Sequence, residues 1–176
     1  MGSEMCIRDR LVRALLDMGR EVEARDHIEA LRSVSPLWYG EALFDYALFL
    51  LGKDDGKALA VLREILEGHP KGDLYHRANY LLGEILAREH HYPDAARAFR
   101  EASKGSGELA LYASVNQGLA LLHAGDPSEA VRIWKGLLDR LGGKPLLRDK
   151  LRFFLGNGYL ALGDPKEALE HFRSIE

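Results

Sequence analysis

The side chains of this sequence that could carry out chemistry are few, and their spacing suits neither catalysis nor metal binding. Glu89-His90-His91 places a carboxylate beside two imidazoles. A zinc-binding helix carries its two histidines four residues apart so that both point from one face, whereas adjacent histidines point to different sides. We therefore expect residues 89–91 to form a solvated turn and to bind no metal.

Two other candidates fail for similar reasons. The stretch KGSGE at residues 104–108 follows no predicted strand and lacks the Gly-Lys-Ser/Thr ending of a phosphate-binding loop. Cys6 is the only cysteine, so the chain forms no internal disulfide. No pair of carboxylates can be assigned to a shared site from the sequence. The sequence thus predicts no catalytic residue, no cofactor and no metal, and we expect a protein that is not an enzyme.

The composition is typical of a soluble globular protein. The chain has 176 residues, of which 47% are hydrophobic, and a formal net charge of −3. This apolar content is sufficient for a core, and the charge disfavours nucleic acid as a partner because nucleic-acid-binding surfaces are strongly basic. No apolar run approaches the length of a membrane-spanning helix, so we expect no direct membrane insertion. No secretory signal is visible, and the compartment stays open between cytoplasm and periplasm.

Two nearly identical segments reveal internal repeats. They are LALLHAGDPSEAVRIW at residues 119–134 and GYLALGDPKEALEHF at residues 158–172. In both, a glycine suits the left-handed residue that ends a helix, the next aspartate suits an N-cap, and the proline suits the first position of a second helix. Glu129 and Glu167, three residues after each aspartate, complete a capping-box pattern. Each segment is therefore predicted to be a helix, a tight turn and a second helix.

An alanine four residues before a large apolar residue extends this pattern along the chain. Successive markers are 34, 37, 35 and 38 residues apart, and they are Ala24, Ala58, Ala95, Ala130 and Ala168. A period near 34 residues with two helices per repeat is the tetratricopeptide spacing.

Further residues strengthen the resemblance to this family. The family's Leu-Gly in the first helix matches Leu82-Gly83 and Leu155-Gly156, and in part Gln117-Gly118. Its closing proline matches Pro36 and Pro70. The chain thus resembles a tetratricopeptide-repeat (TPR) array over essentially its whole length. The resemblance implies an all-α fold, a right-handed α-solenoid of about five antiparallel helix pairs.

The repeat boundaries follow from this register. Residues 11–176 form the array, with repeats expected near 5–36, 38–70, 73–106, 108–144 and 146–176. First helices are expected near 5–18, 38–51, 73–89, 108–124 and 146–162, and second helices near 21–34, 55–68, 92–103, 127–140 and 165–176. Val12 and Tyr46 stand where the family has a small residue, which loosens the register of the first two pairs. Sel1-like repeats are a close alternative, although GDPSEA and GDPKEA lack their longer glycine-containing insertion.

Three glycines inside predicted helices also have a structural meaning. Gly83, Gly118 and Gly156 recur at equivalent positions of the repeat. A glycine within a helix costs about 0.5–1 kcal/mol relative to alanine, so its recurrence indicates a packing requirement. We expect each glycine to face the marker alanine of its partner helix, which would allow the two backbones to approach closely.

Resemblance to the family implies a concave groove lined by one face of the first helices. In the second pair this face reads Gly40, Leu43, Ala47, Leu50 and Leu51. The candidate partner-binding residues in the later pairs are Arg77, Tyr80, Glu84, Arg88, Tyr112, Val115, Leu119, Lys150, Phe153 and Asn157. Aromatic residues often anchor interfaces, so Tyr80, Tyr112 and Phe153 are the strongest candidates. The apolar members also fit a second interpretation, packing between repeats.

These features predict a non-catalytic protein–protein interaction scaffold or adaptor that binds a peptide or a partner helix in the groove. The alternative is a regulatory or substrate-presenting TPR segment of a larger enzyme or cell-envelope assembly protein. The carboxylate clamp with which some TPR adaptors hold the acidic tails of heat-shock chaperones is disfavoured, because Tyr80, Glu84, Val115 and Phe153 occupy the corresponding face.

The first ten residues, MGSEMCIRDR, carry a different signal. Glu4-Met5-Cys6-Ile7-Arg8-Asp9 is the translation of a string that resembles the mosaic-end adapter of transposase-based sequencing libraries. We therefore expect residues 1–10 to be an adapter-derived leader on a metagenome-derived bacterial fragment, and Cys6 to have no redox role. We also expect the terminal repeats to lack capping helices, and self-association through them to be possible.

Overall fold

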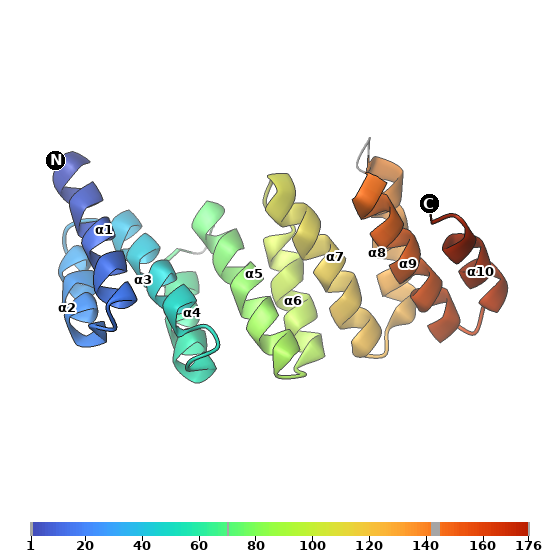
Figure 1. The fold of residues 1–176 in the computed structure, drawn as a ribbon, viewed down its shortest axis with the longest axis horizontal. Helices are drawn as coiled ribbons and strands as arrows, with labels where there is room; N and C mark the ends of the chain where they lie inside the picture. Colours follow the sequence, from blue (N-terminus) through green and yellow to red (C-terminus); the bar gives the residue numbers. More distant parts are fainter. Residues whose placement is uncertain (1, 70, 142–144, 176) are drawn as a thin grey trace. The chain divides into compact units, whose positions relative to one another are not determined.

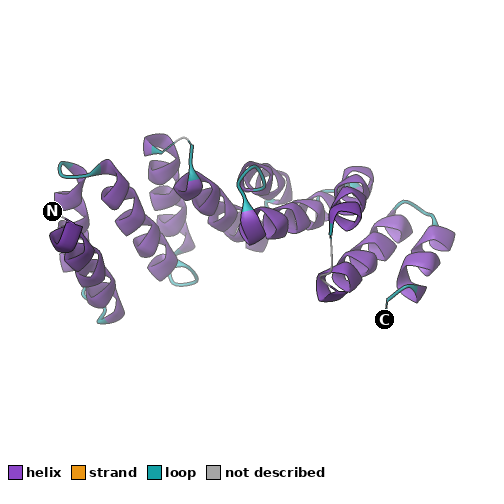
Figure 2. Ribbon diagram, turned by 90° about the horizontal axis from the view of Figure 1, so that it is seen from above, coloured by secondary structure: helices purple, strands orange, loops and turns teal. Residues whose placement is uncertain are grey.

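The structure, a computed structural model, describes residues 2–69, 71–141 and 145–175, and the regular secondary structure of these residues is all helix (Figures 1 and 2). This part of the chain holds ten helices and no strand. The helices are α1 (Gly2–Asp17), α2 (Glu21–Arg32), α3 (Pro36–Leu50), α4 (Asp55–Gly68), α5 (Asp73–Arg88), α6 (Tyr92–Ala102), α7 (Gly107–His123), α8 (Pro127–Arg140), α9 (Pro145–Ala161) and α10 (Pro165–Arg173). Every boundary lies within three residues of the predicted one. The all-α solenoid prediction is confirmed.

The helices belong to two compact units. Unit 1 comprises Met1–Ile85, with α1 to α4 and most of α5, and unit 2 comprises Leu86–Glu176, with the end of α5 and α6 to α10. Consecutive helices pack against one another from α1 to α4 in unit 1 and from α6 to α10 in unit 2, and first helices of neighbouring pairs also meet, α1 with α3 and α7 with α9. Each helix therefore buries its apolar face against the elements next to it in the chain.

The turns inside the last two pairs have the predicted geometry. Gly125 has φ +87° and Gly163 has φ +78°, the left-handed conformation that glycine adopts without steric cost. Asp126 Oδ1 accepts a hydrogen bond from the backbone N–H of Glu129 at 3.1 Å, and Asp164 Oδ1 accepts one from Glu167 at 3.2 Å. These bonds satisfy N–H groups that have no partner inside the helix, so the N-cap prediction is confirmed. The capping box is not completed at Glu129, because its carboxylate accepts from Arg132 and the Asp126 N–H donates to the Leu121 carbonyl oxygen.

Two of the three predicted helix glycines, Gly118 and Gly156, pack differently from the prediction. A Cβ on Gly118 would lie 2.3 Å from Trp134 Nε1, and a Cβ on Gly156 would lie 2.4 Å from a ring atom of Phe172. The facing residue is thus the aromatic one turn after the marker alanine, and the prediction of an alanine was wrong. The physical reason is size, because a planar ring needs the space that a missing side chain leaves.

Trp134 is the centre of the core of unit 2. Its side chain is fully buried, stacks on Phe154 with ring centroids 5.4 Å apart, and donates a hydrogen bond from Nε1 to the carbonyl oxygen of Val115 at 3.2 Å. The bond matters because a buried indole N–H without an acceptor is destabilising. Trp134 therefore ties α8 to α7 and α9 through one side chain.

In unit 1 the positions that correspond to Gly118 and Trp134 are occupied by residues of different sizes. Val12 and Tyr46, which occupy the small-residue position of the first two pairs, are both buried. Sixteen residues later, where unit 2 has Trp134, stand the smaller Ile28 and Leu62. The Tyr46 hydroxyl donates to Glu21 Oε1 at 2.6 Å, which gives its polar end a partner. A larger residue on the first helix is thus matched by a smaller one on the second.

Two expectations concern the chain as a whole. Helix α1 runs from Gly2 through residue 10 without interruption, the Cys6 side chain lies outside the described residues, and the adapter-derived leader stays a prediction. Among the described residues no helix is both long enough and apolar enough to span a membrane.

Candidate functional site

A hollow in unit 1 crosses the first helices of three neighbouring pairs. Its volume is about 430 Å³, and its lining residues come from α1, α3 and α5: Arg13, Leu37, Trp38, Glu41, Asp45 and Arg77. It therefore lies where the family resemblance predicts a groove, and Arg77 is the predicted groove residue that lines it.

Charged pairs between helices border this hollow. Arg77 Nη1 lies 2.9 Å from Glu41 Oε2, and Arg13 Nη2 lies 3.6 Å from Asp45 Oδ1. The Arg77 guanidinium also lies over the Phe44 ring, 4.3 Å from its centroid. Arg77 is therefore engaged by an acid and an aromatic ring at once, which orients its planar group.

The α3 face that was assigned to the groove is mostly buried, which agrees with the second interpretation, packing. Gly40, Leu43, Ala47 and Leu50 are buried, and Leu51 is half-buried. A Cβ on Gly40 would lie 2.4 Å from His69 Nε2, so α4 and its C-cap pack against this side of α3. Helix α3 is apolar around most of its circumference, and its periodicity does not show which side is covered.

The exposed side of α3 consists of other residues. Leu37 and Leu48 are 59% and 41% exposed, and Glu41 and Asp45 on the same side are half-buried. Leu37, Glu41 and Asp45 line the hollow, and two of them carry a negative charge. The least buried side of α3 is therefore more charged than the sequence suggested.

Tyr80 and Glu84 follow Arg77 along α5 at helical spacing, and both are half-buried. Arg88, in the last turn of α5, is exposed and already belongs to unit 2. The structure therefore places the α5 candidates in two different units.

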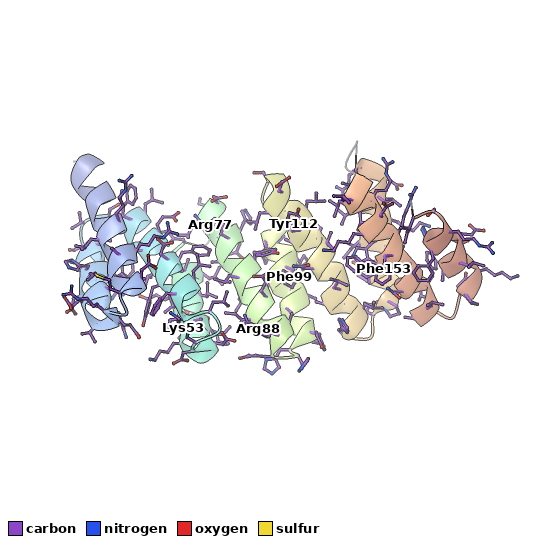
Figure 3. All side chains as sticks on the ribbon, in the orientation of Figure 1. Lys53, Arg77, Arg88, Phe99, Tyr112 and Phe153 are labelled. Atoms are coloured by element: carbon purple, nitrogen blue, oxygen red, sulfur yellow. The ribbon has the colours of Figure 1, made fainter. Side chains whose placement is uncertain are left out.

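Unit 2 holds two of the three strongest candidates, Tyr112 and Phe153, on two helices that touch. Tyr112 on α7 is 46% exposed and Phe153 on α9 is 50% exposed (Figure 3). Lys150 is exposed, and Leu119 and Asn157 are half-buried on the same helices. Large aromatic side chains that remain half in solvent are available to a partner.

Val115 does not belong to this surface. Its side chain is 2% exposed and lies in the core with Trp134, whose indole bonds the Val115 carbonyl. The helical spacing placed Val115 beside Tyr112 and Leu119, but Val115 belongs to the buried cluster that contains Trp134. We therefore leave Val115 out of the proposed surface.

The histidine turn has the expected solvated character. Residues 89–91 are exposed, His91 Nδ1 lies 3.6 Å from Glu89 Oε2, and His90 Nδ1 is 2.7 Å from the Tyr92 hydroxyl. In the part of the chain that the structure describes, no group of three or more His, Cys, Asp or Glu side chains is arranged to hold a metal ion.

A second hollow in unit 1 was not foreseen from the sequence. Its volume is about 650 Å³, and it lies between α2, α3 and α4 with Tyr39, Tyr46 and Glu64 among its lining residues. Tyr39 donates to Glu64 Oε1 at 2.5 Å. Burial, with the neighbouring carboxylates, raises the pKa of Tyr39, and the same causes raise the pKa of Tyr46 to about 12. Both phenols are therefore held as hydrogen-bond donors.

The only sequence signal for these pairs is their separation. Tyr39 precedes Glu64 by 25 residues, and Glu21 precedes Tyr46 by the same number. That distance is not the repeat period, so a search for repeats does not find it.

The fold and its surface define the class of the protein. Antiparallel helix pairs that bury their faces against chain neighbours, with half-exposed aromatics on the first helices, are the architecture of a helical-repeat protein. Sequence comparison identifies the repeat. The family described as Tetratricopeptide repeat matches residues 56–107, 80–145 and 116–176, which together run without a gap from 56 to 176. The chain belongs to the tetratricopeptide-repeat family.

Solved structures agree with this fold. MamA (41-end) from Desulfovibrio magneticus RS-1 is 20% identical, with a TM-score of 0.72 over 99% of this chain and 94% of that chain. MamA of AMB-1 is 16% identical, with a TM-score of 0.70 over 98% and 90%. TPR-like repeats assigned to a kinesin light chain of Podosopora anserina are 15% identical, with a TM-score of 0.70 over 99% and 96%. At these identities the likeness shows a shared fold.

No curated protein matches the chain in sequence. Membership in the tetratricopeptide-repeat family supports a role as a protein-interaction scaffold.

Proposed function

We propose that this protein is a non-catalytic scaffold that binds a peptide or a helix of a partner protein on the exposed faces of its first helices. The observation that carries the proposal is the pair of half-exposed aromatics, Tyr112 and Phe153, on the touching helices α7 and α9. Aromatic side chains dominate the binding energy of many interfaces because they bury large areas at small entropic cost.

The surrounding residues support the same surface. Leu119 and Asn157 are half-buried on the same two helices, α7 and α9, and Lys150 adds an exposed positive charge. An apolar centre with polar and charged groups around it is the usual composition of a protein-binding patch. In unit 1 the hollow bordered by Arg77 and Glu41 adds a polar binding region of its own.

The test uses peptides selected by the protein itself. A phage-displayed peptide library is selected on the intact chain, and the dissociation constants of the selected peptides are measured by calorimetry for wild type and for Tyr112→Ala/Phe153→Ala. We expect the double substitution to weaken binding at least about tenfold, as removal of interface aromatics commonly does. Circular dichroism checks that the variant keeps its helices.

The matched control is Leu169→Ala on α10. Leu169 is 47% exposed, close to the value of Phe153, but lies on the second helix α10 and is not one of the residues of the proposed surface. Its substitution should leave the affinities unchanged. Selected peptides that bind wild type and the double variant equally well would refute the proposed surface.

A further inference from the structure

The exposed side of α9 carries apolar residues at a regular spacing. Leu146, Phe153 and Leu160 are 89%, 50% and 51% exposed, and each follows the last by seven residues. Lys150 and Asn157 lie between them along the same side, the first exposed and the second half-buried. We call these five residues the α9 seam. With a rise of 1.5 Å per residue, the seam is roughly 21 Å long.

The spacing of the α9 seam is that of one strand of a coiled coil. Steps of four and three residues alternate from Leu146 to Leu160, so that Leu146, Phe153 and Leu160 occupy d positions and Lys150 and Asn157 occupy a positions of a heptad. Large apolar side chains at d insert between side chains of a facing helix, and a polar residue at a selects the register. An extended peptide, with its period of two, cannot match this spacing over its length.

The charge of the α9 seam selects the partner further. Asp149 is the acidic residue of α9, and it pairs with Arg152 at 3.3 Å. Lys150 lies 5.9 Å from the centroid of the Phe154 ring, and within the described residues no carboxylate is at ion-pair distance from its Nζ. A facing acid would therefore meet an available cation.

Resting on the proposed function, we propose that the α9 seam binds one amphipathic helix of a partner protein, with apolar residues at heptad spacing and an Asp or Glu opposite Lys150. The d residues supply the buried apolar contact, and Lys150 supplies charge complementarity. A partner helix with a positive charge opposite Lys150 would be repelled, so the α9 seam should discriminate against it.

A second copy of this chain fits the α9 seam less well. Parallel pairing of two copies places Lys150 of one against Lys150 of the other, which is repulsive. Antiparallel pairing sets the polar residues Lys150 and Asn157 against the apolar d residues of the other copy, where their polar groups lose water without gaining a partner. The charge pattern favours a different chain as the occupant.

The experiment uses two synthetic helical peptides as probes. Both have about 21 residues, three heptads, with Leu at every d position; one has Glu and the other Lys at every a position. Affinities for the intact protein are measured by fluorescence anisotropy of a labelled peptide. We expect wild type to bind the Glu peptide about tenfold more tightly than the Lys peptide, and Lys150→Glu to reverse this order.

Further variants separate the α9 seam from the rest of the surface. Phe153→Ala should weaken both peptides about tenfold, since it removes an apolar anchor without changing charge. Leu169→Ala should leave both unchanged. Equal binding of the two peptides, failure of Lys150→Glu to reverse the order, or no binding of either peptide would overturn the proposal.

The outcomes also separate this proposal from the proposed function. Phage-selected peptides that lose affinity in Tyr112→Ala/Phe153→Ala but lack heptad spacing and ignore Lys150→Glu would keep the binding surface and refute the helical partner. Sedimentation of the free protein tests whether a second copy of this chain occupies the α9 seam. A dimer that Phe153→Asp converts to a monomer would identify the occupant as a second copy and overturn the choice of a partner protein.

Discussion

In the core of the helix pairs, the sizes of two facing residues sixteen positions apart are complementary. Gly118 is paired with Trp134 and Gly156 with Phe172, and in each pair the ring lies against the bare backbone. In unit 1 the corresponding first-helix residue Tyr46 is large and buried, and its second-helix counterpart is aliphatic. A missing side chain on the first helix leaves the space that a ring on the second helix fills, because interiors are closely packed.

This complementarity predicts opposite effects for two glycine-to-alanine substitutions in helices. Gly118→Ala should lower the free energy of unfolding by about 1–3 kcal/mol, because the new Cβ meets the buried indole of Trp134. Gly136→Ala, in α8, meets no atom within 4 Å and should raise it by about 0.5–1 kcal/mol through helix propensity alone. Urea denaturation followed by circular dichroism measures both. A stabilising Gly118→Ala would contradict the packing explanation.

Helix ends in this chain are not equally secured. The aspartates before α8 and α10 accept hydrogen bonds from the first turn, as does Asp54 before α4, whose Oδ1 lies 3.0 Å from Lys57 N. Ser106, the N-cap of α7, makes no side-chain capping bond. Residues of the same general cap type thus contribute differently according to their local geometry.

A pair of cap substitutions tests this difference. Asp126→Ala should destabilise the chain by about 1 kcal/mol, because the N–H of Glu129 loses its acceptor. Ser106→Ala serves as the control and should change the free energy of unfolding by much less, since there is no side-chain bond to lose. Thermal denaturation of both variants in the same buffer measures the two losses of stability. Equal losses would show that the cap bond of Asp126 is not the source of its effect.

The molecule as a whole is divided into two units that each have their own buried core. In repeat proteins most stabilising contacts join neighbours in the chain, so stability is approximately a sum of local contributions. Unfolding of one unit alone is then expected to require less free energy than unfolding of both.

A core substitution in one unit tests this independence. Leu62→Ala removes a fully buried side chain of unit 1 and should destabilise that unit by about 2–5 kcal/mol. Hydrogen exchange read by mass spectrometry should become faster in α2 to α4 and change little in α7 and α8. Leu151→Ala, in unit 2, should give the reverse pattern. Equal acceleration in both units would show a single cooperative structure.

Much of this protein could be predicted from the sequence because its information is local and repeated. The Gly-Asp-Pro turns appear twice, and turn and cap preferences depend on a few adjacent atoms, so Gly125, Asp126 and Pro127 identify a helix boundary without knowledge of the fold. The repeat period then extends these boundaries to weaker copies such as Ala24 and Ala58, both of which are fully buried.

The tertiary structure decided which side of each helix is covered. Gly40 and Leu43 were assigned to the surface and are buried, Val115 belongs to the buried cluster that contains Trp134, and two of the helix glycines meet rings where alanines were expected. A helix that is apolar on most sides, such as α3, fits several orientations equally well by its periodicity. Only the size and shape of the residues on the facing helix select one orientation, and those residues lie far away in the chain.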